Sequence, residues 1–396
     1  MNPSATENQQ ELLSDQQVKA IRARFPVFDS KVYLNSCSQG ALCDVVKNSL
    51  DEHTQSWDEL GSPWDLWVEK YEAARSAFAV FINADADEVA IVPSASAGIN
   101  AVASAFDYRE RKRVVMGEFE FPTMGQIWLA QQARGAEVRF VESTNGCLPP
   151  ASYEEAIDSE TLLVPLTHVC FMNGHRSDVR AVTNLAHQQG ALVMLDDYQD
   201  CGTRPVDVKR LQLDFYVSGA LKYLLSPSGI AFLYVRRDLI DSLVPSITGW
   251  FGQTNPFAFD LKHFDPAVNA RRFEAGSPPV PQVYAVLAAL GLLTSVGPAK
   301  ICAHIGALAQ AYLKGARDLQ IKSKTPLNSR GPLVVLQMKD AEAVVRRLSD
   351  GGIVASNRMD GLRVSFHLYN TLEDVQAVLR ILESSLDLTV RDSNQQ

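Results

Sequence analysis

The sequence lacks the features that would place this protein in a membrane, outside the cell or on nucleic acid. No apolar run reaches the roughly 18 residues that a membrane-spanning helix needs. The N-terminus has neither a basic nor an apolar stretch, so we expect no secretory signal. The 37 basic and 46 acidic residues form no long charge run, and the net charge of −9 argues against a nucleic-acid surface. We therefore expect a cytoplasmic protein that binds neither membrane nor nucleic acid.

Cysteine is also sparse, and its spacing argues against a disulfide-stabilised protein and against a zinc protein. The six cysteines form no CxxC pair and no His/Cys pattern typical of zinc sites; they are Cys37, Cys43, Cys147, Cys170, Cys201 and Cys302. Such scattered thiols indicate neither a disulfide framework nor a metal site, and we expect them to be reduced. Internal repeats and low-complexity tracts are absent too. At 396 residues the chain is long enough for two domains.

Short apolar runs alternate with helical patterns between residues 88 and 235. This alternation predicts an α/β domain with a mostly parallel sheet, helices on both faces and ligands at the carboxyl ends of the strands. The run from Gly229 to Val235 is expected as an edge strand. A second, smaller α/β pattern follows toward the C-terminus. We expect an N-terminal segment over 1–30, a large domain over 31–255 and a small C-terminal domain over 256–396.

The most informative stretch runs from Ala191 to Leu225. A short apolar strand ends on Asp196 and Asp197, and a second strand-like run is followed by Lys222 among leucines. An acid at one strand end and a lysine just past another suggest a pyridoxal phosphate (PLP) site, with Lys222 as the Schiff-base lysine. Apolar neighbours would lower the lysine pKa. Two features alone leave other interpretations open, because an acid pair can cap a helix and a lysine can extend to water.

Three other positions follow strand-like runs and could face the same ligand. Ala95 and Ser96 open a helical run, where backbone amides can hold a phosphate, although serine is also an ordinary helix cap. Phe121 could stack on a cofactor ring or could belong to the core. Cys37, in a small and polar loop, could face the substrate or be a buried spectator thiol.

Six stretches together resemble the class V aminotransferase family of fold-type I PLP enzymes. They are LDDYQ, SGALKYLLSPSGIAFLYV, EFPTMGQIW, GWFGQ, RRFEAGSPPVP and LRVSFHLYNT. The family includes cysteine desulfurases, kynureninases and isopenicillin-N-epimerase-like proteins, and the resemblance covers about residues 30 to 386. It implies the PLP-transferase fold of type I, pyridoxal 5′-phosphate as cofactor and a homodimer with shared active sites.

Carried over residue by residue, the resemblance assigns the ring end of the cofactor first. Lys222 would carry the internal aldimine, and Asp196, not Asp197, would pair with the pyridinium nitrogen. Gln199 would hydrogen-bond the phenolic oxygen, and Phe121 would stack on the ring.

The same resemblance assigns the phosphate and the substrate ends. Ala95 and Ser96 lie at the phosphate loop, and Trp250 and Ser277 match positions that reach the phosphate, Ser277 from the neighbouring subunit. Arg363 matches the arginine that grips the substrate α-carboxylate.

The chain also departs from two branches of this family. The stretch GGIVASNRMDG lacks the catalytic cysteine of cysteine desulfurases, and Met124 and Leu221 replace an acid and a tyrosine of kynureninases. The expected function is a PLP enzyme acting on a small α-amino acid through a Lys222 aldimine and a quinonoid, as a lyase that cleaves a β-substituent. Transamination or epimerisation is the alternative. A non-catalytic PLP-fold sensor is less expected, because Lys222, Asp196 and Arg363 are all present.

Overall fold

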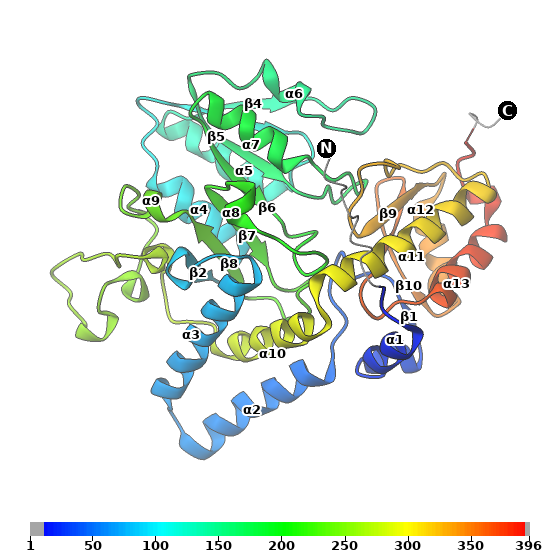
Figure 1. Cartoon of the computed structure of the whole chain (residues 1–396), viewed down its shortest axis with the longest axis horizontal. Helices are drawn as coiled ribbons and strands as arrows, with labels where there is room; N and C mark the ends of the chain where they lie inside the picture. The colour runs from blue at the N-terminus through cyan, green and yellow to red at the C-terminus, as the bar shows by residue number, and fades with distance from the viewer. Residues whose placement is uncertain (1–11, 393–396) are drawn as a thin grey trace, which may run out of the picture.

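A computed structural model describes residues 12–392, which form a large α/β unit beside a smaller one (Figure 1). The first 11 residues, part of the predicted N-terminal segment, lie outside the described residues. The α-helices are α1 Asp15–Arg22, α2 Asp44–Leu60, α3 Trp64–Phe81, α4 Ala95–Ala105, α5 Pro122–Ala130, α6 Ala151–Glu154, α7 Val179–Gln188, α8 Val208–Leu211, α9 Arg237–Ile240, α10 Val280–Val296, α11 Pro298–Asp318, α12 Ala341–Asp350 and α13 Leu372–Glu383. The strands are β1 Val32–Tyr33, β2 Val89–Val92, β3 Arg113–Gly117, β4 Glu137–Val141, β5 Thr161–Thr167, β6 Leu192–Asp196, β7 Phe215–Gly219, β8 Ala231–Val235, β9 Leu333–Gln337, β10 Ile353–Val354, β11 Ser356–Arg358 and β12 Gly361–Ser365.

The large unit is built on a seven-stranded sheet of order β2-β8-β7-β6-β5-β3-β4. Strands β7, β6, β5, β3 and β4 pair in parallel, whereas β8 runs antiparallel to both of its neighbours. The expectation of an edge strand at Gly229–Val235 is therefore wrong. All five β8 residues are buried because β2, from far earlier in the chain, covers the side that would otherwise be open.

Helices cover both faces of this sheet, as the apolar runs predict. Alternate strand residues point to opposite faces. Met194 belongs to one apolar cluster with Trp128 of α5, and the next residue, Leu195, belongs to another cluster with Phe78 of α3 and Val182 of α7. A strand that is buried on both faces reads as a continuous apolar run, which is why these strands show no alternation in the sequence.

The smaller unit has a three-stranded antiparallel sheet of order β11-β12-β9, next to helices α11, α12 and α13 (Figure 1). The N-terminal strand β1 pairs in parallel with β10, and Arg22 of α1 lies 2.7 Å from Asp374 of α13. Helix α10 packs against α2 and α3. The division at residues 30 and 255 stays a prediction.

Residues 12–392 contain no single helix with the length and apolar composition to cross a membrane. The consecutive helices α10 and α11 meet those two criteria only as a pair, bent by 77° at the break between them.

The parallel strands bring sequence-distant loops to one edge of the large sheet. The carboxyl ends of β3, β5, β6 and β7 lie there, because parallel neighbours end on the same side. Residues at and just after the ends of these strands therefore lie close together, and they include four of the expected site residues: Phe121, Asp196, Gln199 and Lys222.

Candidate active site

Lys222 lies in the turn that follows β7, partly buried among aromatic rings. Its Nζ atom is 4.3 Å from the centre of the Tyr198 ring and 5.7 Å from that of Phe121. Burial lowers the pKa of Lys222 to about 8, although the nearby Asp196 carboxylate works in the opposite direction. A lysine with such a pKa has a far larger neutral fraction near neutrality than an ordinary lysine, and the neutral amine is the form that reacts with a carbonyl group.

Asp196, the last residue of β6, is the acid that shares this site with Lys222. Its side chain is buried and accepts a 3.0 Å hydrogen bond from the Tyr198 amide. Burial raises the pKa of Asp196 to about 6, partly offset by the Tyr198 amide and by Lys222. The carboxylate is therefore held close to a cation in a water-poor environment.

Asp197 is engaged elsewhere. His168 Nδ1 lies 2.6 Å from one of its oxygens, and the Tyr216 hydroxyl donates to the other at 2.8 Å. Adjacent residues at a strand end point to opposite sides, which accounts for the different partners of Asp196 and Asp197. The arrangement agrees with the sequence-based choice of Asp196 over Asp197 as the ligand-facing acid, a choice that stays a prediction.

His168, Asp197 and Asp200 form a group whose ligand atoms lie within 4.8 Å of one another, close enough to hold a cation. Their polar atoms already have partners within the protein, because Arg204 forms an ion pair with Asp200 and Tyr216 donates to Asp197. We interpret the group as a buried hydrogen-bonded network that holds the loop after β6 in place.

Gln199 and Cys37 connect that loop to the N-terminal loop. The Gln199 side-chain amide donates to the Cys37 carbonyl oxygen at 3.1 Å, and the Cys37 amide donates to the Ser365 hydroxyl at 3.0 Å. The Gln199 side-chain oxygen is buried and has no hydrogen-bond partner within residues 12–392. The Cys37 side chain is only 1 % exposed. The Gln199 side-chain oxygen thus stays available to a hydrogen-bond donor on a ligand, whereas the Cys37 thiol lies in a packed environment.

The expected phosphate loop lies at the start of α4. Ser94 is the N-cap, accepting a 3.1 Å hydrogen bond from the Ala97 amide, so the cap is not Ser96. The Ser96 hydroxyl instead lies 2.8 Å from that of Thr123, in the first turn of α5. Ala95 is the first residue of α4. Two helix N-termini therefore meet at this point, and both favour an anion.

Phe121 is the N-cap residue of α5 and is 44 % exposed. Its ring contacts Phe171 edge-on at 5.1 Å between ring centres. The preceding residue, Glu120, is buried and accepts a 2.7 Å hydrogen bond from the Thr167 amide at the end of β5. Burial raises the pKa of Glu120 to about 8. This buried acid is a feature that the sequence pattern did not reveal.

Trp250 and Ser277 lie farther along the chain. Trp250 opens the short 3₁₀ helix Trp250–Gly252, and its ring is stacked against Phe259 at 6.0 Å between centres. Ser277 is exposed. No contact joins either of them to Lys222 or Asp196 in the described part of the chain, so their assignment to the phosphate stays a prediction.

Arg363 lies in the middle of β12 and is only 1 % exposed. Its guanidinium donates to the Ser38 hydroxyl at 2.8 Å, to the Ser356 hydroxyl at 3.1 Å and to the Phe171 carbonyl oxygen at 3.1 Å. None of these partners is charged. Because its partners are neutral, the buried Arg363 guanidinium has no negative charge paired with it and can bind an anionic ligand. The bond to Phe171 also connects Arg363 to the large unit.

Several residues of the site were not found from the sequence. Tyr198, Ser38, Ser356 and Phe171 contact the expected residues only through the tertiary structure. Arg358 of β11 belongs with them, since its charge and that of Arg363 both act to lower the Lys222 pKa. Of these residues, only Ser38 lies in a stretch that the sequence marked as ligand-facing, the small polar loop. The residue that the sequence singled out in that loop was Cys37, not Ser38.

The residues fit PLP. A lysine with a lowered pKa, a buried carboxylate next to it and two helix N-termini match the aldehyde, the pyridine nitrogen and the phosphate of the cofactor. The unpaired Gln199 oxygen and the unneutralised Arg363 also point to a polar ligand in this space.

Comparison with known proteins leads to the same group of enzymes. The aminotransferase class-V family profile matches residues 65–378. An uncharacterised aminotransferase, YcbU of Bacillus subtilis, is 34% identical over 90% of this chain and 94% of its own length. A "probable cysteine desulfurase" of Streptomyces coelicolor is 29% identical over 92% and 96%, and a kynureninase of Pseudomonas fluorescens is 26% identical over 93% and 92%.

A solved structure shows the same fold. It is a C-DES variant with glycine covalently linked to its PLP cofactor, and it superposes with a TM-score of 0.85 at 22% identity, covering 91% of this chain and 98% of that one. The α/β architecture of fold-type I PLP enzymes, expected from the motifs, is thereby confirmed.

Proposed function

The chain belongs to the aminotransferase class-V family of PLP-dependent enzymes, and from that premise we propose that it acts on a small α-amino acid with Lys222 as the cofactor-bearing lysine. The observation that carries the proposal is the pairing of Lys222, whose pKa burial lowers to about 8, with the buried Asp196 at the end of the neighbouring strand.

The residues divide the work as follows. Bound PLP would supply an electron sink next to Cα of the amino acid. Lys222, with its lowered pKa, is suited to take the Cα proton. Asp196 would hold a proton at the ring nitrogen. Arg363 would hold the α-carboxylate and so direct the Cα–H bond toward Lys222.

For the outcome, we propose a lyase that cleaves a C–S or similar bond to the β-carbon. The similarity to a protein named cysteine desulfurase and to a kynureninase supports this choice. The segment 351–361 carries no cysteine, and part of it is paired in β10 and β11. A cysteine nucleophile from that segment is therefore not part of the proposed mechanism.

Transamination is the second candidate, with epimerisation sharing the same residues. The 34% identity to a protein named as an aminotransferase favours transamination specifically. Lyase and transaminase would both start with removal of the Cα proton by Lys222, and they would differ in whether a β-substituent leaves.

Three measurements test the proposal. Borohydride reduction followed by peptide mapping should place the pyridoxyl group on Lys222, and its recovery on another lysine would refute the site. Screening small amino acids should then detect sulfide or ammonia with a keto acid for a lyase. A keto acid formed only when an amino-group acceptor is added would instead identify a transaminase. Lys222→Ala should abolish turnover, and Lys209→Ala, on the partly exposed helix α8, should not.

We also propose that the enzyme is a cytoplasmic homodimer, with Ser277 reaching the phosphate in the neighbouring subunit. The exposure of Ser277 and the exposed apolar side chains of the segment 256–268 support an interface there.

A further inference from the structure

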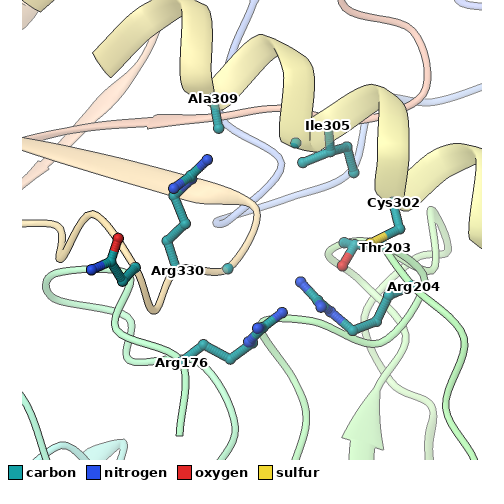
Figure 2. Close-up of a pocket in the computed structure, with 10 residues that line it drawn as sticks. Arg176, Thr203, Arg204, Cys302, Ile305, Ala309 and Arg330 are labelled. Carbon is teal, nitrogen blue, oxygen red and sulfur yellow. The ribbon is translucent and has the colours of Figure 1, made fainter. Parts of the chain in front are cut away.

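Three arginines from three separate loops line one pocket beneath helix α11 (Figure 2). They are Arg176 after β5, Arg204 after β6 and Arg330 before β9, and the pocket has a volume of about 220 Å³. Figure 2 shows the guanidinium groups of Arg176 and Arg204 facing each other, while Arg330 extends toward α11 near Ala309. None of the residues that line the pocket belongs to the candidate active site.

Backbone contacts hold two of these loops together. The Arg176 amide donates to the Ser329 carbonyl oxygen at 3.1 Å, and the Gly331 amide donates to the Gly174 carbonyl oxygen at 3.0 Å. A Cβ atom at Gly331 would lie 2.5 Å from a methyl group of Val169, so the two loops approach closely. The positions of Arg176 and Arg330 are thus set by pairing between segments, which makes the pocket a preorganised feature.

The positive charge of the pocket is only partly balanced. Arg204 forms an ion pair with Asp200, and that buried carboxylate also lies 3.5 Å from His168 Nδ1. No carboxylate within residues 12–392 lies at ion-pair distance from Arg176 or Arg330; Arg330 donates to the Leu327 carbonyl oxygen. Burial, followed by the like charge of Arg204, lowers the pKa of Arg176. Only one of the three guanidinium groups is therefore paired with a carboxylate, and that carboxylate also contacts His168.

We propose that this pocket binds a small oligoanion whose oxygens accept hydrogen bonds from the three arginines, either phosphate or a compact dicarboxylate. Guanidinium forks match the oxygen spacing of both groups. The volume is below the roughly 300 Å³ at which pockets for drug-sized ligands begin, so a compact anion fits and a nucleotide does not. Ile305 and Ala309 of α11 provide an apolar wall that strengthens the electrostatic attraction.

The test is calorimetric titration of the PLP-loaded protein with inorganic phosphate and, separately, with malonate, at constant ionic strength in chloride. We expect saturable binding of at least one of the two anions, with one site per chain. The anion that binds more tightly shows whether the pocket prefers phosphate or a dicarboxylate. Arg330→Gln should raise the dissociation constant of the anion at least tenfold. Arg346→Gln, with a side chain 67% exposed on α12, is the matched control and should leave it unchanged.

Absence of saturable binding for both anions would overturn the proposal. So would equal affinity in the wild type and in Arg330→Gln, because the anion would then lie elsewhere, for example at the candidate active site. If Arg330→Gln does not fold, as judged by circular dichroism, Arg176→Gln replaces it with the same expected loss.

Discussion

At the scale of single residues, burial of charge determines the chemistry of the candidate site. Burial lowers the pKa of Lys222 and raises those of Asp196 and Glu120, so the three groups titrate much closer to neutrality than in water. Perturbed groups that cluster in this way are characteristic of active sites. The neighbouring Asp197, equally buried, has instead two polar partners that hold it in place.

The two adjacent acids should respond differently to the same change. Asp196→Asn should nearly abolish turnover while PLP stays bound, because the amide cannot hold a proton at the pyridine nitrogen. Asp197→Asn should retain turnover and lower the free energy of unfolding by about 1–3 kcal/mol, since a buried partner of His168 and Tyr216 is weakened. Steady-state kinetics, cofactor absorbance and urea unfolding measure these effects. An inactive Asp197→Asn beside an active Asp196→Asn would contradict the assignment.

Glu120 should make stability depend on pH. The pKa of Glu120 is about 8 in the folded protein, against an ordinary value of 4.5. Between pH 4.5 and pH 8 the unfolded chain therefore releases a proton that the folded chain retains. Stability should therefore fall as pH rises from 5 to 8, by at most roughly 1.4 kcal/mol per pH unit. Glu120→Gln should remove this fall, as measured by urea unfolding at pH 5 and pH 7.5. The control is Glu118→Gln, an exposed glutamate. Parallel pH profiles of wild type and Glu120→Gln would count against a buried neutral acid.

Arg363→Lys tests the substrate end. Lysine keeps the charge but cannot reach Ser38, Ser356 and the Phe171 carbonyl oxygen while presenting two parallel N–H groups. We expect a folded, PLP-loaded protein whose amino-acid affinity is reduced by about two orders of magnitude. Spectrophotometric titration with substrate measures this. Arg358→Lys in β11 serves for comparison, and a larger loss in that variant would transfer the role of carboxylate clamp to Arg358.

At the scale of secondary-structure elements, close approach of strands and loops positions the lysine. Gly219 ends β7, and the Tyr198 ring occupies the space that a side chain at this position would fill. The Tyr198 ring in turn lies 4.3 Å from Lys222 Nζ. The absence of a side chain at Gly219 therefore allows the loop after β6 to cover the turn after β7.

Gly219→Ala should consequently move Tyr198 and disturb Lys222. We expect destabilisation of about 1–3 kcal/mol, because an added methyl group in a packed region forces its neighbours to shift. PLP affinity should fall as well. Gly291→Ala is the control: this glycine lies within α10 with no atom near its added Cβ, so the change should be neutral or stabilising. Thermal unfolding and cofactor absorbance measure both variants, and equal behaviour of the two would show that Tyr198 does not depend on Gly219.

At the scale of the whole molecule, one segment carries an unusual amount of exposed apolar surface. Phe259, Leu261, Phe264 and Val268 have exposed fractions of 75%, 96%, 55% and 74%. They lie between residues 256 and 268, close in sequence to Trp250. Exposed apolar side chains in such a cluster are typical of a protein interface.

Size-exclusion chromatography with light scattering should give twice the chain mass of 43.6 kDa for the wild type. Leu261→Asp should shift the equilibrium toward monomer, because a buried charge at an interface is costly. Val80→Asp on α3, where the valine is 77% exposed, is the control and should stay dimeric. A monomeric wild type, or a fully dimeric Leu261→Asp, would exclude this segment as the dimer contact.

The amino-acid sequence by itself indicated the α/β class and the alternation of helices and strands in the large unit, and it predicted that Asp196 and Lys222 share one site. These follow from local patterns, since a buried parallel strand is a short apolar run and its ligand-facing residue comes at its carboxyl end. The family motifs in the sequence also predicted PLP as the cofactor, and the comparisons confirm this prediction.

Tertiary structure alone decided the features that depend on contacts between distant segments. The interior place of β8 depends on β2, about 140 residues earlier, and the neutral partners of Arg363 come from two separate loops and from strand β11. Tyr198 covers Lys222, and three arginines converge beneath α11, for the same reason. Local periodicity carries no information about which loops meet, because that is settled by how the sheet and helices pack together.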